Sequence, residues 1–329
     1  MESNETKKVN LLKTYIDLKT ECNSNSFCIE AALSEYIDNS IQSILSDYSI
    51  KKGWIEENVI DFLEKNDERN TINIIDDLKQ YNLTVDIIFT HEKENHSLTS
   101  NIKKIIIKDN ACGIEHDDLA RAMNMSKINV KINKNSMHAY GVGMKISSFW
   151  LGNNTVIYTK RKGDNFVSKG NYNSPLDIKR DPRKNDDVVI SIDKLFDEKI
   201  INKFNDSNSG TIIEVQAITD ENLFDKMFDK GSWKDEKNLD SNLNIFRTLG
   251  MKYYKYLEKK ILKINIITKN PNSGDDTYEI KPESLLIYNT KTKNGVNPFI
   301  IKEYFEKHKN ELEFETPEEM QEYLKQELN

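Results

Sequence analysis

The segment from residue 28 to residue 45, CIEAALSEYIDNSIQSIL, carries two stripes of residues at helical spacing. Four aliphatic side chains lie four, four and three residues apart, which predicts the core-facing side of a helix: Leu33, Ile37, Ile41 and Ile44. Four polar side chains fall on a different face of that helix: Glu35, Asp38, Asn39 and Gln42. Asp and Asn are mediocre helix formers, so this polar face is either solvated or part of a site. Taken alone, the segment favours the solvated face.

Further along the chain, runs rich in β-branched residues predict strands, and amphipathic or capped runs predict helices. The predicted strands are residues 83–89, 103–109, 155–161, 187–192, 210–215, 263–268 and 284–290. The predicted helices are residues 8–20, 116–123, 241–260 and one that follows a glycine turn within 141–152; residues 48–82 are expected to form a surface insertion. This order predicts an α+β fold, with a mixed, mainly antiparallel sheet and helices on one face. It lacks regular β-α alternation and a GxxxxGK[ST] motif, which argues against Rossmann and P-loop proteins.

The sequence pattern changes near residue 225. Long charged loops precede this point, and an amphipathic helix and two further predicted strands follow it. We therefore predict two domains, residues 1–225 and residues 226–329. The second unit is short for a complete domain, so we expect it to be cut short.

Composition narrows the class of protein. The chain has 329 residues, 37% apolar and 31% charged, with a net charge of −7, so as a whole it is not built to attract nucleic acid. Three cysteines in no zinc-binding pattern indicate a reducing, cytoplasmic setting: Cys22, Cys28 and Cys112. No apolar run approaches the length of a membrane span.

Three glycine-bearing turns accompany the polar helix. Asp109 ends a predicted strand four residues before Gly113, where its carboxylate can accept from an exocyclic amine. Gly141 and Gly143 precede a helix, and glycines there let the backbone approach a phosphate at the helix N-terminus. Each turn is a weak signal alone, but the order of the set is distinctive.

Together these segments resemble the motifs of the GHKL ATPases, the superfamily of DNA gyrase B, heat-shock 90, histidine kinases and MutL. The matching segments are Glu35-Tyr-Ile-Asp38-Asn39 for ExxDN, Asp109-Asn-Ala-Cys-Gly113-Ile for DxGxG, Tyr140-Gly141-Val-Gly143-Met-Lys145 for the lid box, and Gly210-Thr211 for the GT box. The resemblance covers roughly residues 10–220 and implies a Bergerat-type α/β sandwich followed by a transducer-like, ribosomal-protein-like βαβ domain. Within the superfamily, AYGVGMKISSFWLG (139–152) and FRTLGMKYYKYL (246–257) are most similar to MORC proteins and their prokaryotic relatives.

The resemblance implies a role for each matching residue. Glu35 would orient or deprotonate the attacking water, and Asn39 would bind Mg²⁺. Asp109 would hold the adenine amine with support from Thr211, and Gly113 and Ile114 would complete that turn. The residues wrapping and neutralising the phosphates would be Gly141, Val142, Gly143, Met144 and Lys145.

Some assignments stay open at this point. Ala111 replaces the first glycine of DxGxG and fits only if its φ angle is negative. Asp38 would contact the nucleotide through water, or else cap or pair within the pocket wall, and Ser126 is a further candidate nucleotide contact. Lys291 or Lys293 would be the transducer lysine that reaches the γ-phosphate, the alternative being an exposed loop lysine.

The expected function is Mg²⁺-dependent ATP hydrolysis that drives lid closure and formation of a nucleotide-dependent homodimer. DNA is the expected partner, and phage defence or restriction the expected setting, both from the resemblance rather than from charge. The alternatives are an ATP-dependent dimerisation switch without turnover and a chaperone-like ATPase. A histidine kinase is disfavoured because no phospho-acceptor helix precedes the ATP-binding segment.

Overall fold

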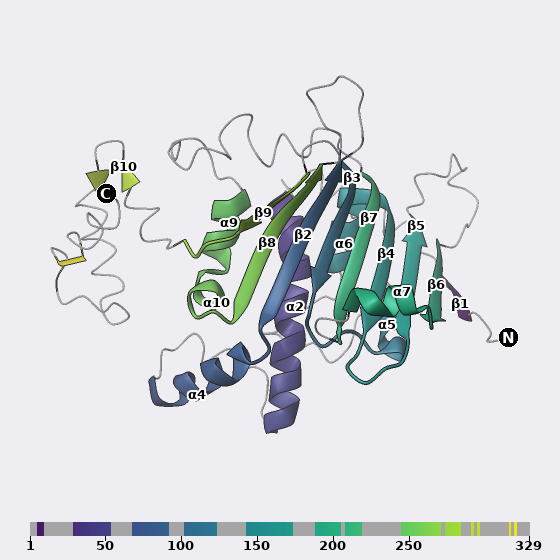
Figure 1. Ribbon diagram of the computed structural model, residues 1–329, viewed down its shortest axis with the longest axis horizontal. Helices are drawn as coiled ribbons and strands as arrows, with labels where there is room; N and C mark the ends of the chain where they lie inside the picture. Colours follow the sequence, from purple (N-terminus) through teal and green to yellow (C-terminus); the bar gives the residue numbers. More distant parts are fainter. Residues whose placement is uncertain are drawn as a thin grey trace, which may run out of the picture.

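The computed structural model shows one large mixed sheet with most of its helices on one face (Figure 1). It describes residues 5–9, 29–53, 68–91, 102–123, 143–173, 188–204, 208–218, 245–270 and 274–283, with short pieces at 291–292, 295–296, 316 and 319–320. The α+β prediction, with a mainly antiparallel sheet, is confirmed.

Nine strands form the sheet, in the order β1-β6-β5-β4-β7-β3-β2-β8-β9. Their bounds are β1 Glu5–Val9, β2 Leu83–His91, β3 Ile102–Asp109, β4 Gly152–Lys160, β5 Val167–Asn173, β6 Val188–Leu195, β7 Gly210–Ile218, β8 Leu262–Asn270 and β9 Gly274–Glu279. Every pairing in this sheet is antiparallel except that of β2 with β8. Strands from both sides of residue 225 therefore share one sheet, while the division into two domains stays a prediction.

Helix α2 (Ile29–Lys52) is the central helix of the covered face. The predicted aliphatic stripe is confirmed, because Leu33, Ile37, Ile41 and Ile44 are all fully buried. Inward-facing strand residues such as Val85, Ile87 and Ile264 belong to the same core cluster. The other helices on this face are α4 Glu68–Lys79, α5 His116–Met123, α6 Gly143–Leu151, α9 Ile245–Lys252 and α10 Tyr254–Glu258. Burial of this aliphatic stripe holds the polar stripe of α2 in a set orientation.

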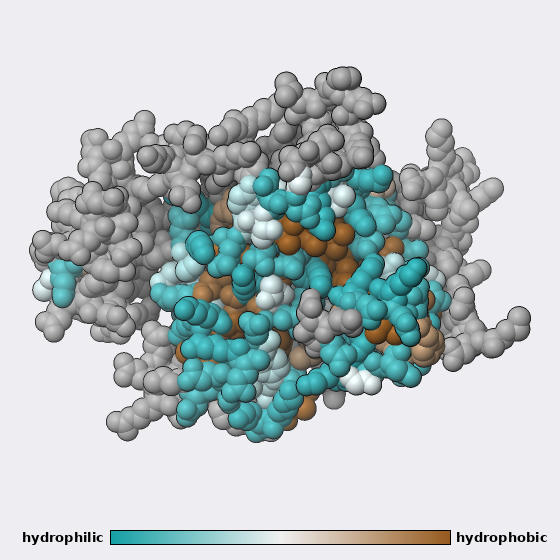
Figure 2. Space-filling model, viewed as in Figure 1, coloured by the Kyte–Doolittle hydropathy of each residue, from teal (hydrophilic) through white to brown (hydrophobic). Residues whose placement is uncertain are grey.

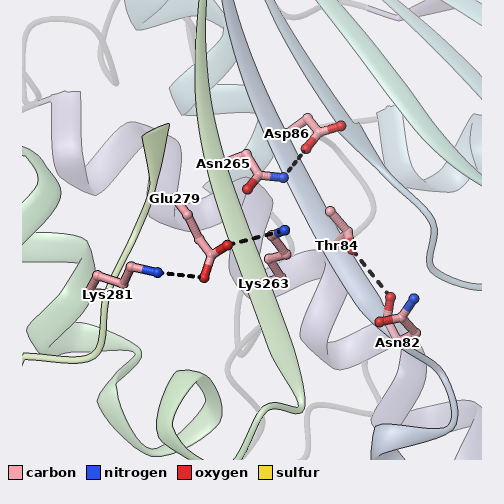
Figure 3. A network of polar contacts seen from close by, with 7 residues as sticks. All are labelled: Asn82, Thr84, Asp86, Lys263, Asn265, Glu279 and Lys281. Atoms are coloured by element: carbon pink, nitrogen blue, oxygen red, sulfur yellow. Dashed lines mark hydrogen bonds and ion pairs between the residues drawn. The ribbon is translucent and has the colours of Figure 1, made fainter. Parts of the chain in front are cut away.

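The opposite face of the sheet is covered only in part within the described residues. There α7 (Glu198–Ile201) and the 3-10 turn η2 (Asn202–Phe204) pack Phe204 against Val167 and Ile212. Figure 2, which views this face, shows a mainly hydrophilic surface with hydrophobic patches. Polar pairs tie β8 to its neighbours, with Asn265 donating to Asp86 at 2.7 Å and Lys263 lying 3.2 Å from Glu279 (Figure 3).

Several predicted elements need correction. The predicted helix 8–20 is wrong at its start, because Lys8 and Val9 pair with β6 in strand β1; residues 10–20 lie outside the described residues. The predicted insertion at 48–82 is not purely superficial, because α4 buries Ile74 and Leu78 in the core. The single helix predicted over 241–260 is divided at Tyr253 into α9 and α10. Strands β5 and β9 were not predicted, and 284–290 lies outside the described residues.

Two further strands, β10 (Lys291–Thr292) and β11 (Gly295–Val296), form a separate two-stranded ribbon. Within the described part of the chain, no helix has both the length and the apolar content needed to cross a membrane.

Candidate functional site

Glu35 lies against the first residue of α6. It is half-buried on α2, and a Cβ atom added to Gly143 would lie 1.7 Å from its Oε2 atom. Only a residue without a side chain leaves room for the carboxylate at that position. The two predicted motifs ExxDN and GxG thus meet in space, and a negative charge at a helix N-terminus is favourable.

The surroundings of Glu35 favour its neutral form more than water does. Burial raises the pKa of Glu35, the nearby Asp38 charge raises it further, and Lys252 lowers it. A carboxylate with a raised pKa accepts a proton more readily, which is what a general base requires.

Asp109 is buried at the end of β3 and accepts three hydrogen bonds. Its Oδ1 atom accepts from the backbone N–H groups of Ala111, at 2.9 Å, and Thr211, at 3.1 Å. Its Oδ2 atom accepts from the Ser40 hydroxyl at 3.0 Å. A carboxylate has about four lone-pair sites, so Oδ2 can take one further donor, such as an amine. Ala111 is absent from the residues with positive φ among those described, so its backbone suits an alanine.

Burial raises the pKa of Asp109 from 3.8 to about 6, against the lowering effect of its three hydrogen bonds. Asp109 therefore takes up a proton at a less acidic pH than an ordinary aspartate, and the protonated group has fewer acceptor sites.

The Thr159 hydroxyl joins the turn after Asp109 to the start of β7. It accepts from the N–H group of Ile114 at 2.7 Å, donates to the carbonyl of Gly210 at 3.2 Å, and lies 3.3 Å from the Thr211 hydroxyl. Gly113 has φ of +73°, and a Cβ there would lie 2.2 Å from the carbonyl oxygen of Lys160. The predicted residues Gly113, Ile114 and Thr211 are thus brought together around Thr159, and Thr211 in turn contacts Asp109.

Asp38 is engaged by the segment after residue 244. The Lys252 ammonium lies 2.9 Å from its Oδ2 atom, and the Tyr253 hydroxyl donates to its Oδ1 atom at 2.7 Å. This geometry shows Asp38 paired with neighbouring groups, while its contact with the nucleotide through water stays a prediction.

Sequence reasoning missed several residues that hold this site: Ser40, Thr159, Lys252 and Tyr253. Thr159 shares the inward parity of Ile157 in a predicted strand, and a polar residue at such a position was the available signal. The contacts of Lys252 and Tyr253 carry no local signal.

The structure describes the remaining predicted site residues only in part. Asn39 is half-buried one turn beyond Glu35 on α2, and Met144 is half-buried in α6. Lys145 belongs to α6 and Lys291 to β10, but their side chains lie outside the described residues, as do Ser126, Gly141, Val142 and Lys293 altogether.

Asn39, the predicted magnesium ligand, offers a metal ion one amide oxygen. Among the described residues, no group of three or more His, Cys, Asp or Glu side chains could hold a metal ion. Mg²⁺ in nucleotide sites takes one or two protein ligands, and substrate phosphates and water complete its shell.

A protein-family model described as "Histidine kinase-, DNA gyrase B-, and HSP90-like ATPase" matches residues 26–211. The match includes Glu35, Asp109, Gly143, Thr159 and Thr211, and it ends before α9. No curated protein matches the chain.

Proposed function

Because the chain belongs to the histidine kinase-, DNA gyrase B- and HSP90-like ATPase family, we propose that it binds Mg²⁺–ATP at this site and hydrolyses it. The adenine amine would donate to the free lone pair of Asp109. The phosphates would lie toward the N-terminus of α6, where Gly143 and Glu35 meet. The observation that carries the proposal is this approach of Glu35 to Gly143, since it places a carboxylate beside the backbone that would cradle phosphate.

The residues divide the chemistry between them. Glu35 would orient the attacking water and take its proton, and the raised pKa of its carboxyl group supports that role. When bound, Mg²⁺ would neutralise phosphate charge, with Asn39 as its ligand from the protein. Phosphoryl transfer depends mainly on positioning and charge neutralisation, and a rigid helix that presents Glu35 and Asn39 one turn apart serves both.

Phosphate release by the wild type and by Glu35→Ala tests this proposal. We expect turnover by the wild type, and its loss in the variant without loss of ATP affinity. Glu30→Ala, at the start of the same helix, is the matched control and should behave as the wild type. A wild type that binds ATP but releases no phosphate would show the non-hydrolysing switch instead. Unchanged ATP affinity in Asn39→Ala and Asp109→Ala would overturn the site assignment.

We further propose a cytoplasmic MORC-like cycle in which ATP pairs two copies of the chain on DNA, in a defence or restriction setting. The support is the similarity of residues 139–152 and 246–257 to MORC proteins. Light scattering with and without a non-hydrolysable ATP analogue tests the pairing, and a DNA titration at several salt concentrations tests the partner. A mass that does not change with nucleotide, or DNA affinity that does not change with salt, would contradict these two steps.

A further inference from the structure

Lys252, the last residue of α9, and Tyr253, which follows it, contact the polar stripe of α2. Lys252 and Tyr253 approach the two carboxylate oxygens of Asp38 from one side, at 2.9 Å and 2.7 Å. The Tyr253 hydroxyl oxygen also lies 3.1 Å from the carbonyl oxygen of Ser34, so the two acceptors share its one hydrogen. Asp38 lies three residues after Glu35 and one before Asn39. These contacts therefore hold the turn of α2 that carries Glu35 and Asn39.

The burial of Asp38 makes its partners important. The Asp38 side chain is only 11% exposed, and a carboxylate so placed needs a cation and donors to offset its lost hydration. Lys252 supplies the charge and also lies 5.3 Å from the centre of the Tyr253 ring. Burial and the Asp38 charge both raise the pKa of Tyr253, so its hydroxyl keeps its proton and remains a donor.

The far side of α9 is anchored as well. A Cβ on Gly250 would lie 2.5 Å from the carbonyl oxygen of Lys281, and the N–H group of Glu283 donates to the carbonyl of Gly250 at 3.2 Å. Arg247 pairs with Glu283 at 2.9 Å, with both side chains largely buried. These contacts hold α9 against residues 281–283 on the side away from α2, just before Lys252 and Tyr253.

We propose that Lys252 and Tyr253, which lie outside the segment matched by the family model, are positioning residues that hold Asp38 and thereby set Glu35 against Gly143 at the start of α6. This inference rests on the proposed ATPase function. Lys252 and Tyr253 act on Asp38 rather than on the nucleotide, so their loss affects turnover more than binding. The influence of Asp38 and Lys252 on the pKa of Glu35 agrees with this arrangement.

The test compares kcat and ATP affinity in Lys252→Met and Tyr253→Phe. Each variant should lower kcat by on the order of tenfold or more, as expected when a reacting group is displaced, and leave the Kd for ATP within about twofold of the wild type. Lys252→Arg keeps the positive charge and should recover most of the lost turnover. Lys255→Met, at an exposed position three residues further along, is the control and should match the wild type.

A double variant sharpens the result. Removing both charges in Asp38→Asn/Lys252→Met should harm turnover less than Lys252→Met alone, because no unpaired buried carboxylate remains beside Glu35. Thermal unfolding of every variant measures the folded fraction. Tyr253→Phe removes a single oxygen atom, so it keeps the test decisive if Lys252→Met does not fold.

The outcomes separate the two proposals. Equal turnover in Lys252→Met, Tyr253→Phe and Lys255→Met, with an active wild type, overturns the positioning role alone. A fall in kcat that only follows a fall in folded protein or in ATP affinity overturns it too. A wild type that binds ATP without releasing phosphate overturns the proposed hydrolysis, and this inference with it.

Discussion

At the scale of single residues, the burial of Asp109 makes the stability of the protein depend on pH. Its folded-state pKa of about 6 lies above the ordinary 3.8, so between these values the folded protein holds a proton that the unfolded chain releases. The contribution of Asp109 to stability is therefore fully present below about pH 4 and is lost as pH rises through 6.

We therefore expect the free energy of unfolding of the wild type to fall relative to Asp109→Asn between pH 4 and pH 7. The difference in pKa corresponds to about 3 kcal/mol. Urea unfolding of both proteins across this range measures it. A difference between the two proteins that stays constant with pH would show that Asp109 titrates normally in the fold.

Gly143 offers a second test at this scale. In Gly143→Ala the new Cβ would meet the Glu35 carboxylate, which is the movable end of a side chain, so we expect the fold to survive and Glu35 to be displaced. Turnover should fall on the order of a hundredfold, the effect of a misplacement of about 1 Å. The variant Gly143→Ala/Glu35→Ala should be no slower than Glu35→Ala. An additive loss would show that Gly143 acts independently of Glu35.

At the scale of elements, α9 shows how close packing can reverse a general preference. Replacing a helical glycine by alanine usually stabilises a helix by about 1 kcal/mol. At Gly250 the added methyl would overlap the backbone carbonyl of Lys281. We expect Gly250→Ala to destabilise the protein by about 1–3 kcal/mol, the typical cost of overpacking. Urea unfolding measures the sign, and a stabilised variant would show that α9 is free to move away from residues 280–283.

Elements with strong local patterns were predictable from the sequence, whereas those determined by distant contacts were not. The helix 116–123 was predicted with the bounds it has, and the spacing of Leu33, Ile37, Ile41 and Ile44 identified the buried face of α2. Strand β5 was not predicted because it has a glycine, Gly170, where a strand would usually carry a side chain. Met123 of α5 packs against that glycine. Strand β9, GDDTYE, is almost wholly exposed and has no hydrophobic alternation.

The same distinction holds within the site. Glu35, Asp109 and Thr211 belong to short motifs that are visible in the chain. The partners of Asp38 lie more than two hundred residues away, with a separation of 214 for Lys252 and 215 for Tyr253. Lysine and tyrosine are common at many kinds of surface position, so only the folded arrangement shows that these two contact the polar stripe.

At the scale of the whole molecule, the sheet makes residues 245–279 part of the structure that carries the site. A chain ending at residue 225 would lose Ile245, Leu249, Ile264 and Ile266 from the core and leave one edge of β2 unpaired. We expect it to aggregate, since exposed strand edges template association. A chain ending at residue 283 keeps β8 and β9 and should stay folded. Size-exclusion chromatography and circular dichroism compare the two, and a monomeric, folded 1–225 chain would support the division at 225.

The parallel pairing of β2 with β8 also has a consequence for synthesis on the ribosome. Strand β2 ends at His91, but the strand that covers its edge is complete only at Asn270. At about 5–20 residues per second, the ribosome needs roughly 10 to 40 seconds to make the intervening chain. Throughout that interval the nascent chain carries the half-apolar strand LTVDIIFTH with an open edge. The time needed to complete this sheet is therefore set by translation. During that time, factors that bind nascent chains would protect the open edge of β2 from association with other chains.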